Sequence, residues 1–323
     1  MAGRTVLTLY AVHAARSEAD GGRGGKSGGT MDTSRPEDHD RDTDEDAEAP
    51  GTAHPATGAS RRSWRNRSPA LRGTGGAALT ADRAGRWRDL QEVSLDLSQR
   101  KLRKERLVAI DRRDAHLSGS FDMLRTRLIT ALKANGWRRV AITSPTAGCG
   151  KTFCAINLAI SLSRLQAVRT VLLDLDLRAP GIAGALGLQP TAPMSDLLTG
   201  ARDMHAHLVR IGGNLALGLN DTPIPDSAET LQAPQTARAL KAMQLDLRPD
   251  VVLYELPPAL GHDDLFAFLP QIDAVLLIAD GTHTTAEDIS ACERILSDRT
   301  PLLGVVLNKA DDPDSRRHAK RGS

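Results

Sequence analysis

The sequence predicts an α/β fold with a mostly parallel, twisted sheet and helices on both of its faces. Short apolar runs alternate with longer segments in which apolar residues recur at helical spacing. The runs lie at residues 140–142, 171–173, 215–217, 251–253, 274–278 and 302–307. Continuous apolar strands separated by helices are typical of a parallel sheet that is buried on both faces. Because ligands of such sheets bind at the carboxyl ends of the strands, we expect the chemistry of the chain there.

A glycine-rich loop, S-P-T-A-G-C-G-K-T-F at residues 144–153, joins the first apolar run to a helix expected at 152–165. In such a loop the backbone N–H groups turn toward an anion, and the helix N-terminus adds partial positive charge. Lys151 would reach the terminal phosphates of a nucleotide, and the Thr152 hydroxyl would hold Mg²⁺. The sequence therefore predicts a P-loop NTPase fold. The predicted nucleotide-binding residues of this loop are Ala147, Gly148, Cys149, Gly150, Lys151, Thr152 and Phe153.

The loop departs from the usual pattern G-x-x-x-x-G-K-[ST], because Pro145 stands where the first glycine is expected. An ordinary helix-opening turn without a phosphate is therefore an alternative. Cys149 lies inside the loop near a helix N-terminus, a place that favours a reactive thiol. The simpler interpretation is that a small residue fits the turn at this position.

Carboxylates follow two of the strands after the loop. Asp174 and Asp176 come after the run 171–173 at alternate positions, so both point to the same side of an extended chain. Such acids suit Mg²⁺ coordination or the orientation of an attacking nucleophile. Glu255 follows the run 251–253, where P-loop NTPases place an acid that holds Mg²⁺. The predicted catalytic residues are Lys151, Asp174 and Asp176, and the predicted metal ligands are Thr152, Asp174 and Glu255.

A third strand end carries Asn308, whose amide is expected to face the edge of a purine. The pattern Asn308-Lys309-x-Asp311 is also the one that guanine-specific GTPases use, which leaves GTP as an alternative nucleotide. The remainder of the chain lacks the order of motifs found in those GTPases. ATP with Mg²⁺ is therefore the predicted cofactor.

Composition divides the chain unevenly. The first part is dominated by Gly, Ser, Thr, Ala, Pro and charged residues, with an acidic run at 37–48 and an arginine-rich stretch at 61–72. Such a segment cannot bury enough apolar surface to become ordered. We expect a disordered low-complexity tail at 1–88, a basic linker helix or extended segment at 89–115, the P-loop ATPase domain at 116–312 and a disordered basic C-terminus at 313–323.

Charge and cysteine content exclude several classes of protein. The formal net charge of +2 gives no indication of a nucleic-acid partner. The three cysteines lack metal-ligand spacing, and their odd number argues against a disulfide framework. No apolar stretch is long enough to cross a bilayer, and the N-terminus does not resemble a signal peptide, so a cytoplasmic protein is expected.

The order of the motifs resembles the cytoplasmic ATPase domain of the bacterial tyrosine kinases of capsule and exopolysaccharide synthesis. These kinases are related to the septum-site and plasmid-partition ATPases. The resemblance covers about residues 106–311. It rests on G-C-G-K-T at 148–152, L-L-D-L-D-L-R-A-P at 172–180, M-S-D-L-L-T-G at 194–200, P-D-V-V-L-Y-E-L-P-P at 249–258 and G-V-V-L-N-K-A at 304–310.

This resemblance implies ATP and Mg²⁺ as cofactors, bound at 148–152, with Asn308 near the adenine. It also implies a partner, namely a membrane polysaccharide co-polymerase or chain-length regulator, and the formation of a homo-oligomer. The protein would then be recruited to the inner face of the cell membrane through that partner.

Three departures from the family change the activity that we expect. The family has aspartate at the position of Glu255, and the extra methylene displaces the carboxylate, so slow turnover is expected. The only tyrosines are Tyr10 and Tyr254, which excludes phosphorylation of a C-terminal tyrosine cluster in this sequence. Of the family's oligomer-forming E-x-x-R-x-x-R pattern, only Arg125 is present. The sequence therefore predicts an ATP-dependent regulator of a membrane co-polymerase rather than an autokinase.

Two other classes share this fold. A partition or positioning ATPase acts as a nucleotide-dependent dimer on DNA or membrane, and it carries a lysine near the start of the loop, where this chain has Thr146. A catalytically weak nucleotide-binding regulator is the second alternative, and Glu255 favours it.

Overall fold

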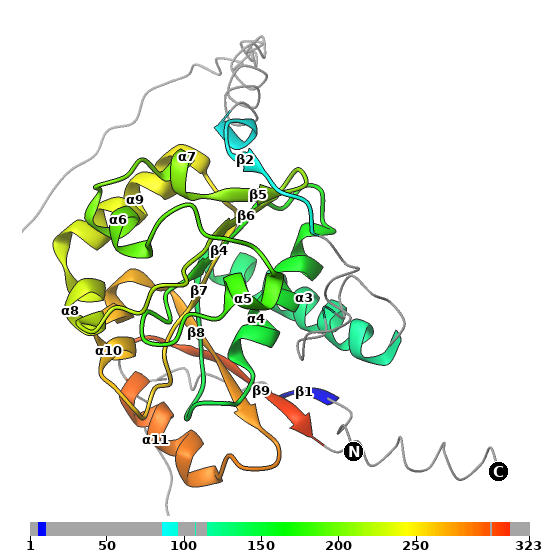
Figure 1. Ribbon diagram of the computed structural model, residues 1–323. Helices are drawn as coiled ribbons and strands as arrows, with labels where there is room; N and C mark the ends of the chain where they lie inside the picture. Colours follow the sequence, from blue (N-terminus) through cyan, green and yellow to red (C-terminus); the bar gives the residue numbers. More distant parts are fainter. Residues whose placement is uncertain (1–5, 11–85, 96–106, 108–114, 298, 311–323) are drawn as a thin grey trace, which may run out of the picture. The chain divides into compact units, whose positions relative to one another are not determined.

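The computed structural model describes residues 6–10, 86–95, 107, 115–297 and 299–310 (Figure 1). In this part of the chain, strands form one sheet with the order β1-β9-β8-β3-β7-β4-β6-β5-β2. The strands are β1 (Val6–Tyr10), β2 (Gln91–Glu92), β3 (Arg139–Thr143), β4 (Thr170–Asp174), β5 (Val209–Ile211), β6 (Leu215–Gly218), β7 (Val251–Glu255), β8 (Ala274–Asp280) and β9 (Leu302–Ala310).

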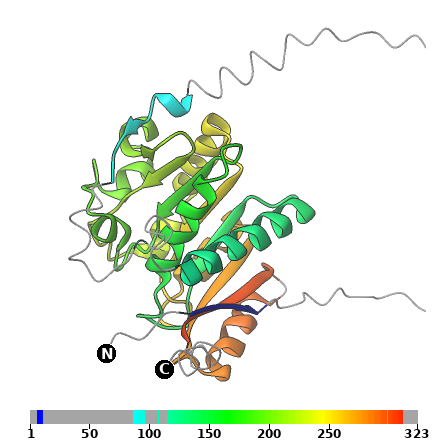
Figure 2. The ribbon, with the colours of Figure 1, turned by 90° about the vertical axis from the view of Figure 1, so that its right-hand side faces the viewer.

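The six apolar runs all lie in strands, namely β3, β4, β6, β7, β8 and β9, and these strands pair in parallel. The mostly parallel sheet is therefore confirmed. The sequence missed β1, β2 and β5, which lie toward the edges of the sheet. There β5 pairs antiparallel with β6, and β1 pairs antiparallel with β9. Figure 2 shows β1 in blue beside β9 in red. β2 and β5 have only two and three residues, too few to give a periodic signal. β1 has the apolar sequence VLTLY but lies inside a segment whose composition is otherwise polar.

Helices cover both faces of the sheet, as predicted (Figures 1 and 2). They are α3 (Ala115–Asn135), α4 (Lys151–Ser163), α5 (Ile182–Leu186), α6 (Met194–Thr199), α7 (Met204–His207), α8 (Ser227–Gln232), α9 (Pro234–Leu247), α10 (Asp264–Phe268), the 3₁₀ helix η1 (Leu269–Gln271) and α11 (Ala286–Leu296). In the described part of the chain, no helix combines the length and the apolar character needed to cross a membrane.

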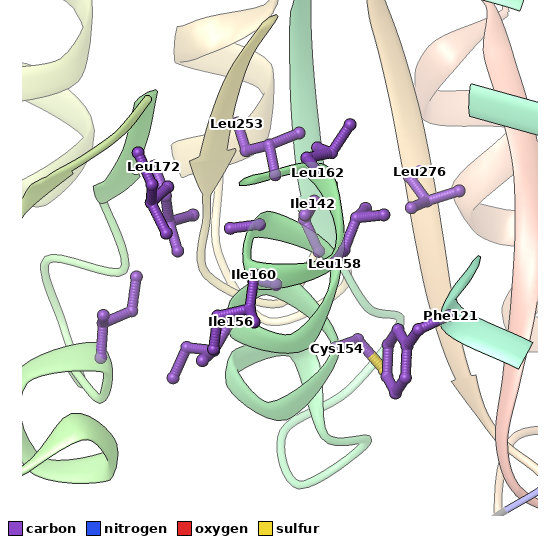
Figure 3. Packing of buried hydrophobic residues seen from close by; sticks show 14 of the residues in the cluster. Phe121, Ile142, Cys154, Ile156, Leu158, Ile160, Leu162, Leu172, Leu253 and Leu276 are labelled. Atoms are coloured by element: carbon purple, nitrogen blue, oxygen red, sulfur yellow. The ribbon is translucent and has the colours of Figure 1, made fainter. Parts of the chain in front are cut away.

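The core is divided between the two faces because successive strand residues point in opposite directions. Ile142 packs in one cluster with Leu158 of α4 and Phe121 of α3, as Figure 3 shows. Its neighbour Ala141 belongs to the other cluster, together with Tyr254 and the buried residues of α9 and α10. Burial of each large apolar side chain stabilises the fold by roughly 1.5–3 kcal/mol. The two clusters therefore fix β3, and with it the glycine-rich loop, in the centre of the sheet.

The range predicted for the disordered tail, 1–88, includes structured residues near both of its ends. Val6–Tyr10 forms β1, and Trp87 is buried with its indole N–H donating to the Leu247 carbonyl at 2.9 Å. In the predicted linker, Leu90 is also buried and β2 pairs with β5, so the described part of this segment is extended rather than helical. A single tryptophan or leucine in a polar stretch has no periodicity that would reveal its contacts. The rest of the predicted tail, most of the linker and residues 313–323 lie outside the described residues.

Candidate active site

Two residues at the end of β9 hold the loop between β3 and α4 by hydrogen bonds to its backbone carbonyls. The Asn308 side-chain amide donates to the Cys149 carbonyl at 2.9 Å, and Lys309 Nζ donates to the Gly148 carbonyl at 2.7 Å. In a trans peptide the N–H group points opposite to the carbonyl. The N–H groups of Cys149 and Gly150 therefore point away from β9, which leaves them for a ligand above the loop.

Glycine is required at position 150. Its φ of 88° lies in the left-handed region, and an added Cβ would approach Asn308 Nδ2 to 2.2 Å. Gly148, with φ of 81°, also adopts a left-handed conformation but has open space around the Cβ position. The loop thus combines a tight backbone with a close contact to Asn308, which explains why G-x-G precedes Lys151 here.

Asn308 is buried, and its amide nitrogen donates to the backbone of the loop. Its predicted contact with a purine stays a prediction. Lys309 also reaches Asp280 Oδ2 at 2.9 Å. Burial opposes ionisation of Asp280, but hydrogen bonds from Thr282 and Lys309 outweigh it and lower its pKa to about 2. The Asn-Lys pair therefore connects the ends of β8 and β9 to the loop, a long-range contact that a local motif does not reveal.

A cavity of about 480 Å³ opens above the loop at the carboxyl edge of the sheet. Among the predicted residues, its lining includes Ala147, Gly148, Lys151, Thr152 and Asp176. Lys151 Nζ lies 3.0 Å from Asp176 Oδ2, and both side chains are largely buried. The rest of the lining comes from Pro145, Thr146, Arg178, Ala179, Pro257, Pro258, Leu260, Gly261 and His262.

A second group of carboxylates is buried next to Thr152 and does not line this cavity. The Thr152 hydroxyl donates to Glu255 Oε1 at 2.5 Å. Asp174 is the register partner of Glu255 across β4 and β7. One Asp174 oxygen accepts from the backbone N–H groups of Gly181 and Ile182 at 3.0 and 2.9 Å. Its other oxygen is buried and accepts no hydrogen bond from any described residue.

The electrostatics of this carboxylate pair favour a bound cation. Burial raises the pKa of Asp174 well above its usual value, and the charges of Glu255 and Asp176 raise it further, against the lowering effect of two backbone N–H groups. No cluster of three His, Cys, Asp or Glu side chains suited to a metal occurs in the described part. Two carboxylates and a hydroxyl are nevertheless a suitable set for Mg²⁺, which proteins hold through one or two carboxylates plus substrate phosphates.

The side chains of Cys149 and Phe153 do not line the cavity. The Cys149 thiol is buried and donates to the Thr146 carbonyl at 3.3 Å, in agreement with the simpler interpretation of a small residue that fits the turn. The Phe153 ring packs edge-to-face against Phe121 of α3, with centroids 5.7 Å apart. Any role of these two residues in nucleotide binding would therefore come from their backbone N–H groups.

Sequence reasoning missed one cationic residue in the lining. Arg178 follows Asp176 by two positions, and its Nε donates to Asp264 Oδ2 at 2.8 Å. The available signal was the place of Arg178 in the run D-L-D-L-R at 174–178, directly after a strand end that carries the predicted acids. Its partner Asp264 lies 86 residues away in sequence, which no local pattern indicates.

Comparison with known families identifies the fold. The family model described as "CobQ/CobB/MinD/ParA nucleotide binding domain" matches residues 140–322, more than half of the chain. The chain belongs to this family. Residues 140–322 include the loop, both groups of carboxylates and the end of β9.

Curated relatives carry the names of tyrosine kinases. The chain is 28% identical over 238 residues to the "Putative tyrosine-protein kinase EpsB" of Ralstonia nicotianae, covering 71% of this chain and 31% of that protein. It is 27% identical over 192 residues to the "Tyrosine-protein kinase YwqD" of Bacillus subtilis, covering 59% of this chain and 80% of that protein. The chain thus spans less than a third of EpsB but most of YwqD.

Solved structures agree with the family. The kinase domain of VpsO has 25% sequence identity and a TM-score of 0.54, and the alignment covers 62% of this chain and 99% of that domain. The kinase domain of the Escherichia coli tyrosine kinase ETK has a TM-score of 0.59 at 20% identity, covering 69% of this chain and 89% of that domain. The latter shows the fold alone.

Proposed function

We propose that this domain binds ATP with Mg²⁺ and uses it for ATP hydrolysis or phosphoryl transfer in exopolysaccharide or capsule biosynthesis. The observation that carries the proposal is the convergence of Lys151, Thr152 and Asp176 on one cavity, with Asp174 and Glu255 directly behind Thr152. The family of nucleotide-binding domains and the similarity to proteins named tyrosine kinases support it.

Each residue has a role that follows from its place. Lys151 and the N–H groups of the loop bind the phosphates, while Thr152, Asp174 and Glu255 hold Mg²⁺. When bound, Mg²⁺ neutralises charge on the phosphate oxygens. Asp176 is paired with Lys151 at 3.0 Å. A bound triphosphate competes for that lysine, and Asp176 is then free to orient water or a hydroxyl for in-line attack.

The phosphoryl acceptor is water or a hydroxyl of a partner protein rather than Tyr254. That tyrosine is fully buried in β7, and its hydroxyl accepts a hydrogen bond from Gln244 at 3.4 Å. Burial raises the pKa of Tyr254 far above its ordinary value, which opposes formation of a nucleophilic phenolate. The partner that we propose is a membrane polysaccharide co-polymerase or chain-length regulator, which would bring the domain to the inner face of the membrane.

The residues of the family's oligomer-forming helix are engaged within this chain. Arg125 of α3 donates to Asp122 at 2.9 Å and to the carbonyl and hydroxyl of Ser161 at 3.1 and 3.2 Å. Asp122 also accepts a hydrogen bond from Arg164, the residue that follows α4, at 2.9 Å. These contacts tie α3 to α4 and engage Arg125 within this chain.

The test follows the fate of the γ-phosphate. Purified protein is incubated with γ-labelled ATP and Mg²⁺, with and without the candidate co-polymerase, and label is measured in free phosphate and on tyrosine. We expect Mg²⁺-dependent label in one of these products and its loss in Lys151→Ala. If the protein neither binds ATP nor releases label in any of these mixtures, the proposal is wrong.

A second candidate is an ATP-binding regulator with slow turnover, which the Thr152–Glu255 contact favours. The long glutamate side chain reaches the hydroxyl directly at 2.5 Å, so this bond competes with Mg²⁺ coordination by both groups. Glu255→Asp shortens the side chain and tests this candidate. A rise in ATP turnover at unchanged ATP affinity would support the regulator, whereas a fall in turnover would favour an active phosphotransferase that is adapted to glutamate.

A further inference from the structure

Arg178 lines the same cavity as Lys151 but comes from a different element, the segment after β4. We propose that Arg178 binds the terminal phosphate of a nucleoside triphosphate and that Asp264 positions it for this task. This inference rests on the proposed function and adds a residue that distinguishes triphosphate from diphosphate.

The guanidinium of Arg178 keeps donors available for an anion. It presents five N–H donors, and the described structure uses Nε for Asp264 Oδ2 at 2.8 Å while giving neither Nη group a partner among described residues. The side chain is 30% exposed, so these groups remain accessible from the cavity. A planar guanidinium with free Nη groups suits a phosphate, to which it donates two parallel hydrogen bonds.

Asp264 is built to hold a charged partner. It is fully buried at the first position of α10, where a carboxylate without a cation would be costly. Only one of its oxygens bonds Arg178, and the other is buried without a hydrogen bond from any described residue. The contact at Nε alone orients the guanidinium without occupying the face used for bidentate recognition.

The position of Arg178 indicates which phosphate it binds. The loop N–H groups surround the phosphates nearer the nucleoside, and Lys151 reaches the terminal ones. Arg178 follows Asp176, which pairs with Lys151 at 3.0 Å, by two residues, and the lining of the cavity also includes the segment 257–262. Asp264 begins the helix that follows this segment. The terminal phosphate would therefore be linked through Arg178 to α10, so that loss of the phosphate changes the restraint on that helix.

The test compares affinities for two nucleotides by isothermal titration calorimetry with Mg²⁺. Wild type, Arg178→Gln, Arg178→Lys and Asp264→Asn are titrated with ADP and with a non-hydrolysable ATP analogue. We expect Arg178→Gln to weaken the analogue on the order of tenfold to a hundredfold, as for a lost charged hydrogen bond, with ADP affinity changed less than about twofold. Arg178→Lys and Asp264→Asn should give intermediate losses, because both keep a cation at position 178. The first lacks the planar guanidinium, and the second lacks the carboxylate that orients it.

Arg139→Gln is the matched control. Arg139 forms an arginine–aspartate pair with Asp273 and is also 30% exposed, but it lies at the start of β3, on the opposite edge of the sheet. We expect it to leave both affinities unchanged. Equal effects of Arg178→Gln on ADP and the analogue, or none on either, would overturn the inference. If Arg178→Gln does not fold, an unchanged affinity ratio in Arg178→Lys would overturn it as well. Wild type that binds neither nucleotide would refute the proposed function instead.

Discussion

Both edges of the sheet contain aspartates, but their hydrogen bonding differs. At the amino edge, Asp273 accepts from Arg139 Nε and Nη2 at 3.1 and 2.6 Å and from the backbone N–H groups of Arg138 and Arg139 at 2.9 and 2.8 Å. Both of its oxygens are satisfied. At the carboxyl edge, Asp174 and Asp264 each keep a buried oxygen that no described residue bonds. At the amino edge the chain itself satisfies the oxygens of Asp273, whereas at the carboxyl edge Asp174 and Asp264 each keep an oxygen that a ligand could contact.

The pKa values of Asp273 and Asp174 move in opposite directions. Burial opposes ionisation of Asp273, but hydrogen bonds from the Arg139 side chain and two backbone N–H groups outweigh it and lower the pKa. Burial raises the pKa of Asp174, and the neighbouring Glu255 adds to the effect. The difference shows that a buried carboxylate stabilises the fold only where the chain itself supplies enough donors.

The largest expected effect is on catalysis. Lys151→Ala removes the cation that pairs with Asp176 and would bind the terminal phosphates, so we expect ATP turnover to fall by about a hundredfold or more. Arg139→Ala at the amino edge serves as its control and should retain turnover. A coupled phosphate-release assay measures both, and equal rates in Lys151→Ala and wild type would refute the role of the loop.

The next effect is on stability at the loop itself. Gly150→Ala forces a side chain into a left-handed conformation and against Asn308, so we expect a loss of about 3 kcal/mol in the free energy of unfolding. Gly212→Ala has a similar φ of 62° but nothing within 4 Å, and it should cost about 1 kcal/mol. Urea denaturation measures both. Equal losses would mean that the contact with Asn308 contributes nothing.

Neutralising one aspartate should change the free energy of unfolding differently at the two edges. In Mg²⁺-free buffer at pH 8, Asp273→Asn should lower the free energy of unfolding by about 2 kcal/mol, because charged hydrogen bonds are lost. Asp174→Asn keeps an acceptor for Gly181 and Ile182 and removes repulsion from Glu255, so stability should stay the same or rise. Urea denaturation distinguishes the two. A loss in Asp174→Asn as large as that in Asp273→Asn would contradict the comparison.

The smallest effect concerns pH. The pKa of Asp273 is lowered in the folded state, so its ionised carboxylate stabilises the fold. This stabilisation is fully present above the pKa of about 3.9 that aspartate has in the unfolded chain, and it is lost as pH falls through the lower pKa of the folded state. The difference in unfolding free energy between wild type and Asp273→Asn should therefore be largest near neutral pH and shrink below about pH 4. Thermal denaturation from pH 3 to pH 7 measures it, and a difference that grows toward low pH would contradict the assignment.

The sequence predicted the parts of the fold and site that depend on local pattern. Strand runs such as 251–253 are buried on both sides and so are continuously apolar, which makes β7 and the carboxylate that ends it visible. The contact between Asn308 and the loop, and the pair of Arg178 with Asp264, join elements that are distant in sequence. Trp87 gives no periodic signal either, although it is part of the core. Those features depend on tertiary packing, which spacing does not encode.

We propose that the carboxyl edge of the sheet binds ATP through Mg²⁺ held beside Asp174 and Glu255. Calorimetric titration of wild type and Asp174→Asn with ATP, in Mg²⁺ and in EDTA, tests it most directly. We expect wild type to lose about tenfold or more in ATP affinity when Mg²⁺ is removed. Asp174→Asn should bind ATP weakly in both buffers, or with the same affinity in both. Wild-type ATP affinity that is the same with and without Mg²⁺, or no ATP binding in either buffer, would contradict it.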